Sequence, residues 1–139
     1  MFVDRDEFLA ATERGAFLET NEFAANGHWY GTPWPDPPSD DLDVLLEIDL
    51  NGARQVKQRL PGAVAILVEP PSRQELERRL RERGDSPDQV ARRLALADVE
   101  LEGGYQLADH VVVNDDLDGA VDEVARILDS HRRTTPREQ

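Results

Sequence analysis

Two acidic residues, Glu47 and Asp49, follow a short apolar run at positions 44–46 and directly precede a stretch with helical periodicity. The apolar run predicts a strand buried on both faces, as in a parallel sheet covered by helices. Side chains at i and i+2 share a strand face, so both carboxylates are expected to point the same way. Open α/β sheets bind their ligands at the carboxyl ends of such strands. From these residues alone two interpretations remain: a ligand site, or acids that merely cap the next helix.

The bulk properties of the chain exclude several classes of protein. Its 139 residues suit one domain with a real core. A formal net charge of −13 argues against a nucleic-acid surface or an anionic membrane as partner. Cysteine is absent, which excludes disulfides and thiolate metal sites, and the three histidines show no ligand spacing. No apolar run approaches the roughly 20 residues of a membrane span, and no signal peptide is recognisable, so we expect a cytoplasmic protein.

The hydrophobic pattern predicts strands that alternate with helices, which is typical of a parallel sheet with helices on both faces. Capping boxes mark helix starts at Asp4 and Ser72, and a proline follows Ser86 at the first helical position. Four prolines between positions 33 and 38 exclude a helix there and predict an extended linker. The predicted strands are 44–49, 63–68 and 108–114, with short strand-like pieces at 17–19 and 29–30. The predicted helices are 4–14, 52–60, 72–83, 86–101 and 118–130.

Several motifs, in the same order along the chain, together resemble the guanylate kinase family, which phosphorylates GMP from ATP. Residues 46–53 resemble the family's Leu-Glu/Asp-Ile-Asp-x-Gln-Gly-Ala-like run, with Asn51 in place of the usual glutamine. The other matches are Gly15-Ala16-Phe17-Leu18-Glu19, Trp29-Tyr30-Gly31-Thr32-Pro33, Pro70-Pro71-Ser72, Arg79-Leu80 with Arg83-Gly84, Arg92-Arg93-Leu94, and Val111-Val112-Val113-Asn114-Asp115-Asp116-Leu117. The resemblance covers nearly the whole chain and implies a P-loop nucleoside-monophosphate-kinase-like α/β fold, a parallel sheet with flanking helices.

The resemblance implies a GMP site in the first half of the chain. Guanine has donors at N1 and N2 and an acceptor at O6, so a site that selects it needs a carboxylate and a hydroxyl. Glu19 matches the family's guanine-reading carboxylate, and Thr32 matches the residue whose hydroxyl contacts the base. Tyr30, next to Gly31 of the same motif, matches the tyrosine that binds the GMP phosphate. Asp49 matches an acid near the base and the metal-bound phosphates. Taken singly, Glu19 would be a surface acid and Tyr30 a packed aromatic.

A second implied group consists of arginines from the other half of the chain. Phosphoryl transfer needs positioning and cations around the oxygens of the migrating group. Arg83 and Arg93 match the lid arginines that close over the phosphates, so together with Asp49 they are the implied catalytic residues. Other arginines of this half, such as Arg78 and Arg81, are expected to form a solvated helix face paired with glutamates.

The resemblance also implies how ATP is bound. Arg79, Arg83 and Asn114 match residues on the ATP side of the family's site, although an asparagine at position 114 could equally form a turn. ATP is the implied co-substrate, and Mg²⁺ arrives with the nucleotide, without a protein metal site.

The predicted organisation divides the chain into four segments. Residues 1–34 form part of a GMP-binding subdomain, and residues 35–43 form the proline-rich linker. Residues 44–131 form the nucleotide kinase core, with the lid around 84–92. Residues 132–139 form a polar tail that is expected to be disordered.

One family motif is missing from the sequence. No Gly-x-x-x-x-Gly-Lys-Ser/Thr run, whose backbone N–H groups and lysine hold the ATP phosphates, occurs in the 139 residues. In the family this loop lies upstream, with a Ser-Arg-x-x-Arg segment for GMP and with a strand between those predicted at 44–49 and 63–68. We therefore expect an N-terminally truncated form of a guanylate kinase. The alternative is a catalytically inactive guanylate-kinase-like binding module, against which the lid arginines argue.

Overall fold

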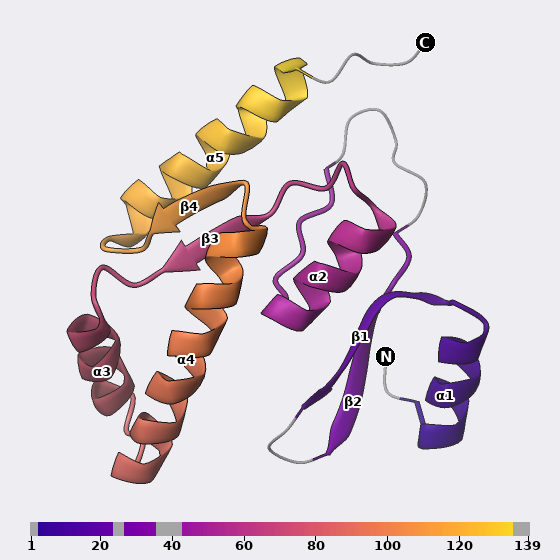
Figure 1. Cartoon of the computed structure of the whole chain (residues 1–139), viewed down its shortest axis with the longest axis horizontal. Helices are drawn as coiled ribbons and strands as arrows, with labels where there is room; N and C mark the ends of the chain where they lie inside the picture. The colour runs from indigo at the N-terminus through magenta and orange to yellow at the C-terminus, as the bar shows by residue number, and fades with distance from the viewer. Residues whose placement is uncertain (1–2, 24–26, 36–42, 135–139) are drawn as a thin grey trace. The chain divides into compact units, whose positions relative to one another are not determined.

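The computed structural model describes residues 3–23, 27–35 and 43–134 of the chain (Figure 1). The chain forms two compact units, with the boundary between Ala63 and Val64. Within the described ranges, each unit combines helices with one two-stranded sheet. The predicted mixed α/β class is therefore confirmed, while the predicted division at residues 34 and 43 stays a prediction.

The first unit contains a β-hairpin and two helices. In chain order these are α1 (Arg5–Glu13), β1 (Phe17–Phe23), β2 (His28–Pro33) and α2 (Leu50–Arg59). The two strands pair in antiparallel fashion, and the register places Glu19 opposite Thr32. Both helices contact β1. The strand-like pieces predicted at 17–19 and 29–30 thus lie within two longer strands.

The helix α1 begins at the predicted capping box. The Asp4 carboxylate accepts the Glu7 backbone N–H at 2.8 Å, and the Glu7 carboxylate accepts the Asp4 N–H at 3.1 Å. Phe8 is the buried residue of this helix, and its ring stacks on Phe17 of β1 with centroids 4.9 Å apart. Burial of these aromatic faces attaches α1 to the hairpin.

The prediction of a buried strand at 44–49 is wrong. Residues 43–49 form no strand, and Val44 and Leu45 are 55% and 73% exposed. A strand is held by backbone hydrogen bonds to a neighbour, and within the described part of the chain no strand pairs with this segment. Asp49 instead caps α2, as the alternative interpretation of the acids predicted. The linker predicted at 35–43 falls mostly on positions 36–42, outside the described residues.

The second unit contains a parallel strand pair and three helices. Its elements are β3 (Ile66–Glu69), α3 (Arg73–Glu82), α4 (Pro87–Leu107), β4 (His110–Val113) and α5 (Leu117–Thr134). The strands pair in parallel from Ile66 opposite His110 onward, which confirms the pairing direction predicted for 63–68 and 108–114. Helix α4 contacts β3, α5 contacts β4, and α3 contacts α4 (Figure 1). Leu80, Val90 and Leu94 form a buried cluster where α3 meets α4.

Two helices are longer than the sequence predicted. Helix α4 passes the predicted end at residue 101 and continues to Leu107, and its Gly104 lies against β3. A Cβ atom at Gly104 would lie 2.8 Å from the end of the Leu67 side chain, so a larger residue there would require Leu67 to shift. Helix α5 continues to Thr134, so a polar tail starting at residue 132 is wrong for 132–134, and residues 135–139 lie outside the described part. None of the helices in the described ranges is both long and apolar enough to cross a membrane.

Candidate active site

The side chain of Glu19 on β1 is buried, and only one of its two carboxylate oxygens accepts hydrogen bonds. The residue is 1% exposed, and its Oε1 accepts hydrogen bonds from the Thr32 backbone N–H at 3.0 Å and the Thr32 hydroxyl at 2.5 Å. The other carboxylate oxygen, Oε2, is buried and has no hydrogen-bond partner among the described residues. Buried polar atoms are nearly always paired, because an unpaired one costs free energy. The unpaired acceptor makes this position a candidate site for a group that donates hydrogen bonds.

The carboxylate of Asp49 connects the start of α2 to the hairpin. Its Oδ1 accepts the Gly52 N–H at 2.8 Å, which caps the helix. Its Oδ2 accepts the Tyr30 hydroxyl at 2.9 Å and also a short hydrogen bond from the Asn21 side-chain amide. Burial and then the hydrogen bond to Asp49 raise the pKa of the Tyr30 hydroxyl above its ordinary value.

Two glycines allow close approaches within this network. A Cβ at Gly52 would lie 3.0 Å from the unpaired Oε2 of Glu19, so α2 begins directly beside that carboxylate. A Cβ at Gly31 would lie 3.0 Å from the Glu19 carbonyl oxygen and from two side chains of β1. A side chain at either position would therefore require its neighbours to shift by a few tenths of an ångström.

Polar side chains that the sequence analysis did not single out fasten α2 to the edge of β1. Gln55 exchanges two hydrogen bonds with the Thr20 backbone, at 3.1 and 2.8 Å. The Arg59 guanidinium donates to the Leu18 carbonyl at 2.7 Å and to the Phe17 carbonyl. These groups replace the partner that an edge strand lacks. The only sequence signal for these two residues was the i, i+4 spacing of Gln55 and Arg59, which places them on one helix face. This spacing does not identify the strand edge that they contact.

Asn21 is a further residue that the sequence analysis missed. Its amide lies between Asp49 and Asn51, because Asn51 donates to the Asn21 carbonyl oxygen at 3.2 Å. Asn51 had been noted only as a departure from the family's glutamine. Glu47, by contrast, is exposed on the non-strand segment before α2.

The structure thus brings four of the predicted GMP-site residues together in the first unit. Glu19 bonds Thr32, Tyr30 bonds Asp49, and the start of α2 joins the two pairs. Their assignment to GMP stays a prediction, because proximity alone identifies no ligand.

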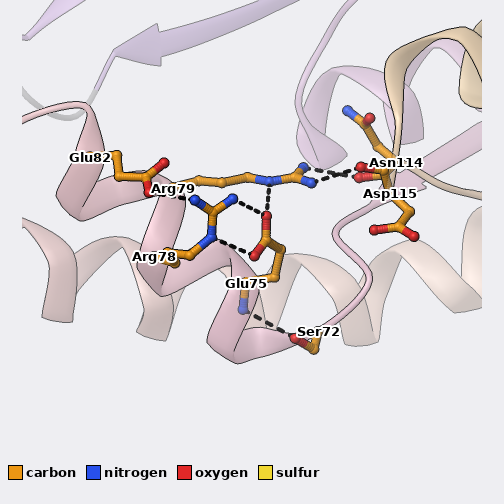
Figure 2. Close-up of polar contacts among 7 residues, drawn as sticks. All are labelled: Ser72, Glu75, Arg78, Arg79, Glu82, Asn114 and Asp115. Carbon is orange, nitrogen blue, oxygen red and sulfur yellow. Dashed lines mark hydrogen bonds and ion pairs between the residues drawn. The ribbon is translucent and has the colours of Figure 1, made fainter.

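Arg79 of α3 contacts the segment that follows β4. Its guanidinium donates to the carbonyl oxygens of Asn114 and Asp115 at 2.9 and 3.1 Å and to the Glu75 carboxylate at 2.6 Å (Figure 2). Arg78 donates twice to the same Glu75 at 2.7 Å and also pairs with Glu82. These hydrogen bonds, from Arg78 and then Arg79, lower the pKa of the Glu75 carboxyl to about 2.

The two predicted lid arginines share one carboxylate. Arg83 lies 2.8 Å and Arg93 3.4 Å from the same oxygen of Asp85. Asp85 is mostly covered, whereas the arginine side chains are 56% and 57% exposed. Two exposed guanidinium groups that meet at one acidic oxygen form an arrangement that can receive the oxygens of a phosphate. Arg81 pairs with Glu77 on a solvated helix face, as predicted.

No set of three or more histidine, aspartate or glutamate side chains among the described residues could hold a metal ion.

Comparison with known proteins decides the family. The sequence pattern described as guanylate kinase matches residues 1–131. The chain belongs to the guanylate kinase family. It is 41% identical to the guanylate kinase of Alkalilimnicola ehrlichii over an alignment of 142 positions, gaps included, which covers 99% of this chain and 68% of that protein. Identity to the guanylate kinase of one Thermus thermophilus strain is 46% over an alignment of 140 positions, which covers 98% of this chain and 62% of that protein.

The chain matches only part of the length of its relatives. The match to the guanylate kinase of Synechococcus sp. strain JA-3-3Ab has 46% identity and covers 91% of this chain but 59% of that protein. Across these three relatives the chain spans 59% to 68% of the relative's length. The family match over residues 1–131 includes every residue of the candidate site.

Proposed function

We propose that this chain supplies the guanine-reading residues and the lid arginines of an enzyme that transfers the γ-phosphoryl group of ATP to GMP, giving GDP and ADP. The observation that carries the proposal is the buried Glu19 carboxylate, held by Thr32 on one oxygen and unpaired on the other. Guanine offers two adjacent donors, at N1 and N2, that fit such a carboxylate, whereas adenine does not.

Each residue of the network has a role in this proposal. Glu19 accepts the two guanine N–H groups, and the Thr32 hydroxyl rotates from Glu19 to donate to O6. The Tyr30 hydroxyl turns from Asp49 and donates to the GMP phosphate. Before GMP binds, Asp49 accepts the Tyr30 hydroxyl at 2.9 Å and so keeps the phenol beside the start of α2. Because Glu19 is only 1% exposed, guanine reaches it only when the start of α2 and the hairpin separate.

The lid residues supply positive charge. In the proposal, Arg83 and Arg93 leave Asp85 for the oxygens of the transferred phosphoryl group and stabilise the charge that develops there. Mg²⁺ neutralises phosphate charge when it arrives bound to ATP, and the protein residues described here position the two nucleotides.

Binding of GMP by the variant Glu19→Gln tests the proposed base recognition. The glutamine amide presents a donor to a guanine donor, so we expect GMP affinity to fall about 100-fold or more. The matched control is Glu22→Gln, the same change on an exposed residue of the same strand, which should leave GMP affinity unchanged. Isothermal titration with GMP and with AMP gives both affinities. Equal GMP affinity for Glu19→Gln and the unmodified chain would contradict the proposal.

An extended protein provides the activity assays. In it the chain is joined to the part of the Thermus thermophilus relative that the match leaves uncovered, which by family resemblance carries the Gly-rich phosphate loop. This protein is used wherever turnover is measured below.

A further inference from the structure

The imidazole rings of His110 and His131 meet where α5 packs against β4 (Figure 1). Their Nε2 atoms are 2.9 Å apart, and the rings are nearly perpendicular, at 80°, with centroids 5.2 Å apart. His110 is the first residue of β4 and His131 lies in the last turn of α5, so the contact joins residues 21 positions apart in the sequence. Both residues are only partly buried and keep part of their surface in solvent.

The backbone that carries the two rings is ordered. The N–H groups of Asp109 and His110 both donate to the Ala65 carbonyl oxygen, at 2.8 and 3.2 Å. The Asp109 carboxylate in turn accepts the Ala65 N–H at 2.8 Å, which fixes the start of the β3–β4 ladder. His131 extends from a continuous helix. Two ligands on regular elements are held more precisely than ligands on loops.

The chemistry of this contact is that of two neutral imidazoles. A hydrogen bond between two Nε2 atoms needs a proton on one of them and a lone pair on the other. Nε2 is also an atom through which neutral imidazole binds transition-metal ions. When the donor ring carries its proton on Nδ1 instead, both Nε2 lone pairs become available. Each ring then turns about its Cβ–Cγ bond to direct its lone pair at a shared ion, and the backbone stays in place.

The separation of the two nitrogens indicates which ions fit. Two nitrogens at about 2.0–2.1 Å from one metal ion are about 2.9 Å apart at a right angle and about 3.3 Å apart at the tetrahedral angle. The 2.9 Å between His110 and His131 equals the right-angle value. Right angles are typical of tetragonal Cu²⁺ and Ni²⁺ sites with imidazole ligands, whereas Zn²⁺ prefers a tetrahedron. Mg²⁺ prefers oxygen ligands and does not suit two imidazoles.

The charges around the pair allow a cation to bind. Arg132, which follows His131, forms an ion pair with the Asp129 carboxylate at 3.6 Å. The Arg133 guanidinium donates to the Asp129 carbonyl oxygen at 3.3 Å. The formal net charge of −13 attracts cations to the chain as a whole.

We propose that His110 and His131 form a two-histidine site for a divalent transition-metal ion of the Ni²⁺ or Cu²⁺ type, and that the bound ion fastens the end of α5 to β4. Because the described residues supply no set of three side-chain ligands, water molecules complete the coordination and the site is a weak one. The proposal does not rest on the proposed function, since it needs neither nucleotide.

Metal titration of the 139-residue chain, prepared without a polyhistidine tag, tests the site. We expect NiCl₂ to bind as one ion per chain and to raise the Tm by about 4 °C near saturation, and EDTA to reverse the shift. His110→Gln and His131→Gln should each weaken Ni²⁺ binding about 100-fold, because the second ligand no longer acts at a high effective concentration. His28→Gln removes the histidine of β2 and is the matched control, which should bind Ni²⁺ like the unmodified chain.

Two results of this titration would overturn the proposal. One is Ni²⁺ binding of unchanged affinity in His131→Gln, and the other is an equal loss of affinity in His28→Gln. MgCl₂ should give no shift of the Tm, and a shift equal to that with NiCl₂ would show a general effect of divalent charge instead of an imidazole site.

A measurement on the unmodified chain decides the question even if a glutamine variant fails to fold. Substoichiometric Cu²⁺ is paramagnetic and should broaden the imidazole proton signals of His110 and His131 in NMR spectra, at concentrations that leave those of His28 unchanged. Equal broadening of all three histidines, or of none, would overturn the proposal. The pair would then be a hydrogen-bonded contact between α5 and β4 only.

Discussion

Glu19 and Thr32 stand opposite each other on the antiparallel strands β1 and β2, and both polar groups of Thr32 donate to one oxygen of Glu19. The hairpin register therefore both buries the carboxylate and directs its other oxygen toward the start of α2, beside Gly52. A one-residue slip in this pairing would turn Glu19 to the other face of the hairpin.

The hydroxyl of Thr32 should contribute to the stability of the first unit. We expect Thr32→Val to lower the free energy of unfolding by about 1–3 kcal/mol, because it removes one partner of a buried carboxylate. Thr12→Val is the control, since the Thr12 hydroxyl bonds only the Phe8 carbonyl within α1. Chemical denaturation of both variants measures the difference. An equal loss of unfolding free energy in the two variants would mean that the Glu19–Thr32 hydrogen bond contributes no more to stability than the Thr12–Phe8 hydrogen bond.

The approach of α2 to Glu19 should require glycine at position 52. A methyl group there would lie 3.0 Å from Glu19 Oε2 and 3.2 Å from the Ile48 Cβ, so we expect Gly52→Ala to cost about 1–3 kcal/mol of unfolding free energy. Gly62→Ala is the matched control, because a Cβ at Gly62 meets no atom within 4 Å. Thermal and urea unfolding compare the two. A Gly52→Ala protein as stable as the control would show that the helix start is not packed against the carboxylate.

The ionisation of Glu75 should show the two arginine contacts directly. Its folded-state pKa of about 2 lies below the ordinary 4.5 of a glutamate, so its contribution to stability is present above pH 4.5 and is lost as pH falls toward 2. Titration of the Glu75 carboxyl carbon by NMR should give the low value at low salt. In Arg78→Ala the pKa should move back toward 4.5, since Arg78 makes the largest contribution. An unchanged Glu75 pKa in this variant would contradict the assignment of the low pKa to the contact with Arg78.

The lid arginines should matter for the rate. In the extended protein we expect Arg83→Ala or Arg93→Ala to lower kcat by a factor of about 100–1,000, the range for loss of one preorganised charge contact. Arg81→Ala removes an exposed arginine that pairs with Glu77, and it should leave kcat unchanged. Steady-state kinetics with saturating ATP and GMP provide the comparison. Equal kcat in all three variants would exclude Arg83 and Arg93 from the transition state.

The sequence predicted best those features that depend on neighbouring residues. Both sides of the Asp4–Glu7 capping box formed, as did the helix start at Ser86. At Ser72 only the serine side formed, because the Glu75 carboxylate binds the two arginines. These signals are local, since each depends on side chains within one helical turn.

Most features that depend on distant partners were not predicted, although the parallel pairing of β3 with β4 was. The apolar residues at 44–46 have strand character, but a strand forms only beside a hydrogen-bonded neighbour, and none in the described residues offers one. The bonds from Gln55 and Arg59 to β1 join residues far apart in the sequence, as the 35-residue separation of Gln55 from Thr20 shows. Sequence patterns did not predict the pairing of Glu19 with Thr32 either. Only the family resemblance placed these residues at one site.

Turnover of GMP tests the central claim most directly. ADP formation with GMP as acceptor is measured in a coupled assay on the extended protein, its Glu19→Gln variant and the 139-residue chain at equal concentration. The account predicts a competent GMP kinase in the extended protein, loss of GMP turnover in Glu19→Gln, and negligible turnover by the 139-residue chain, whose sequence contains no Gly-x-x-x-x-Gly-Lys-Ser/Thr run. A folded extended protein that fails to phosphorylate GMP, or one whose Glu19→Gln variant works equally well, would contradict the account and favour a guanylate-kinase-like binding module.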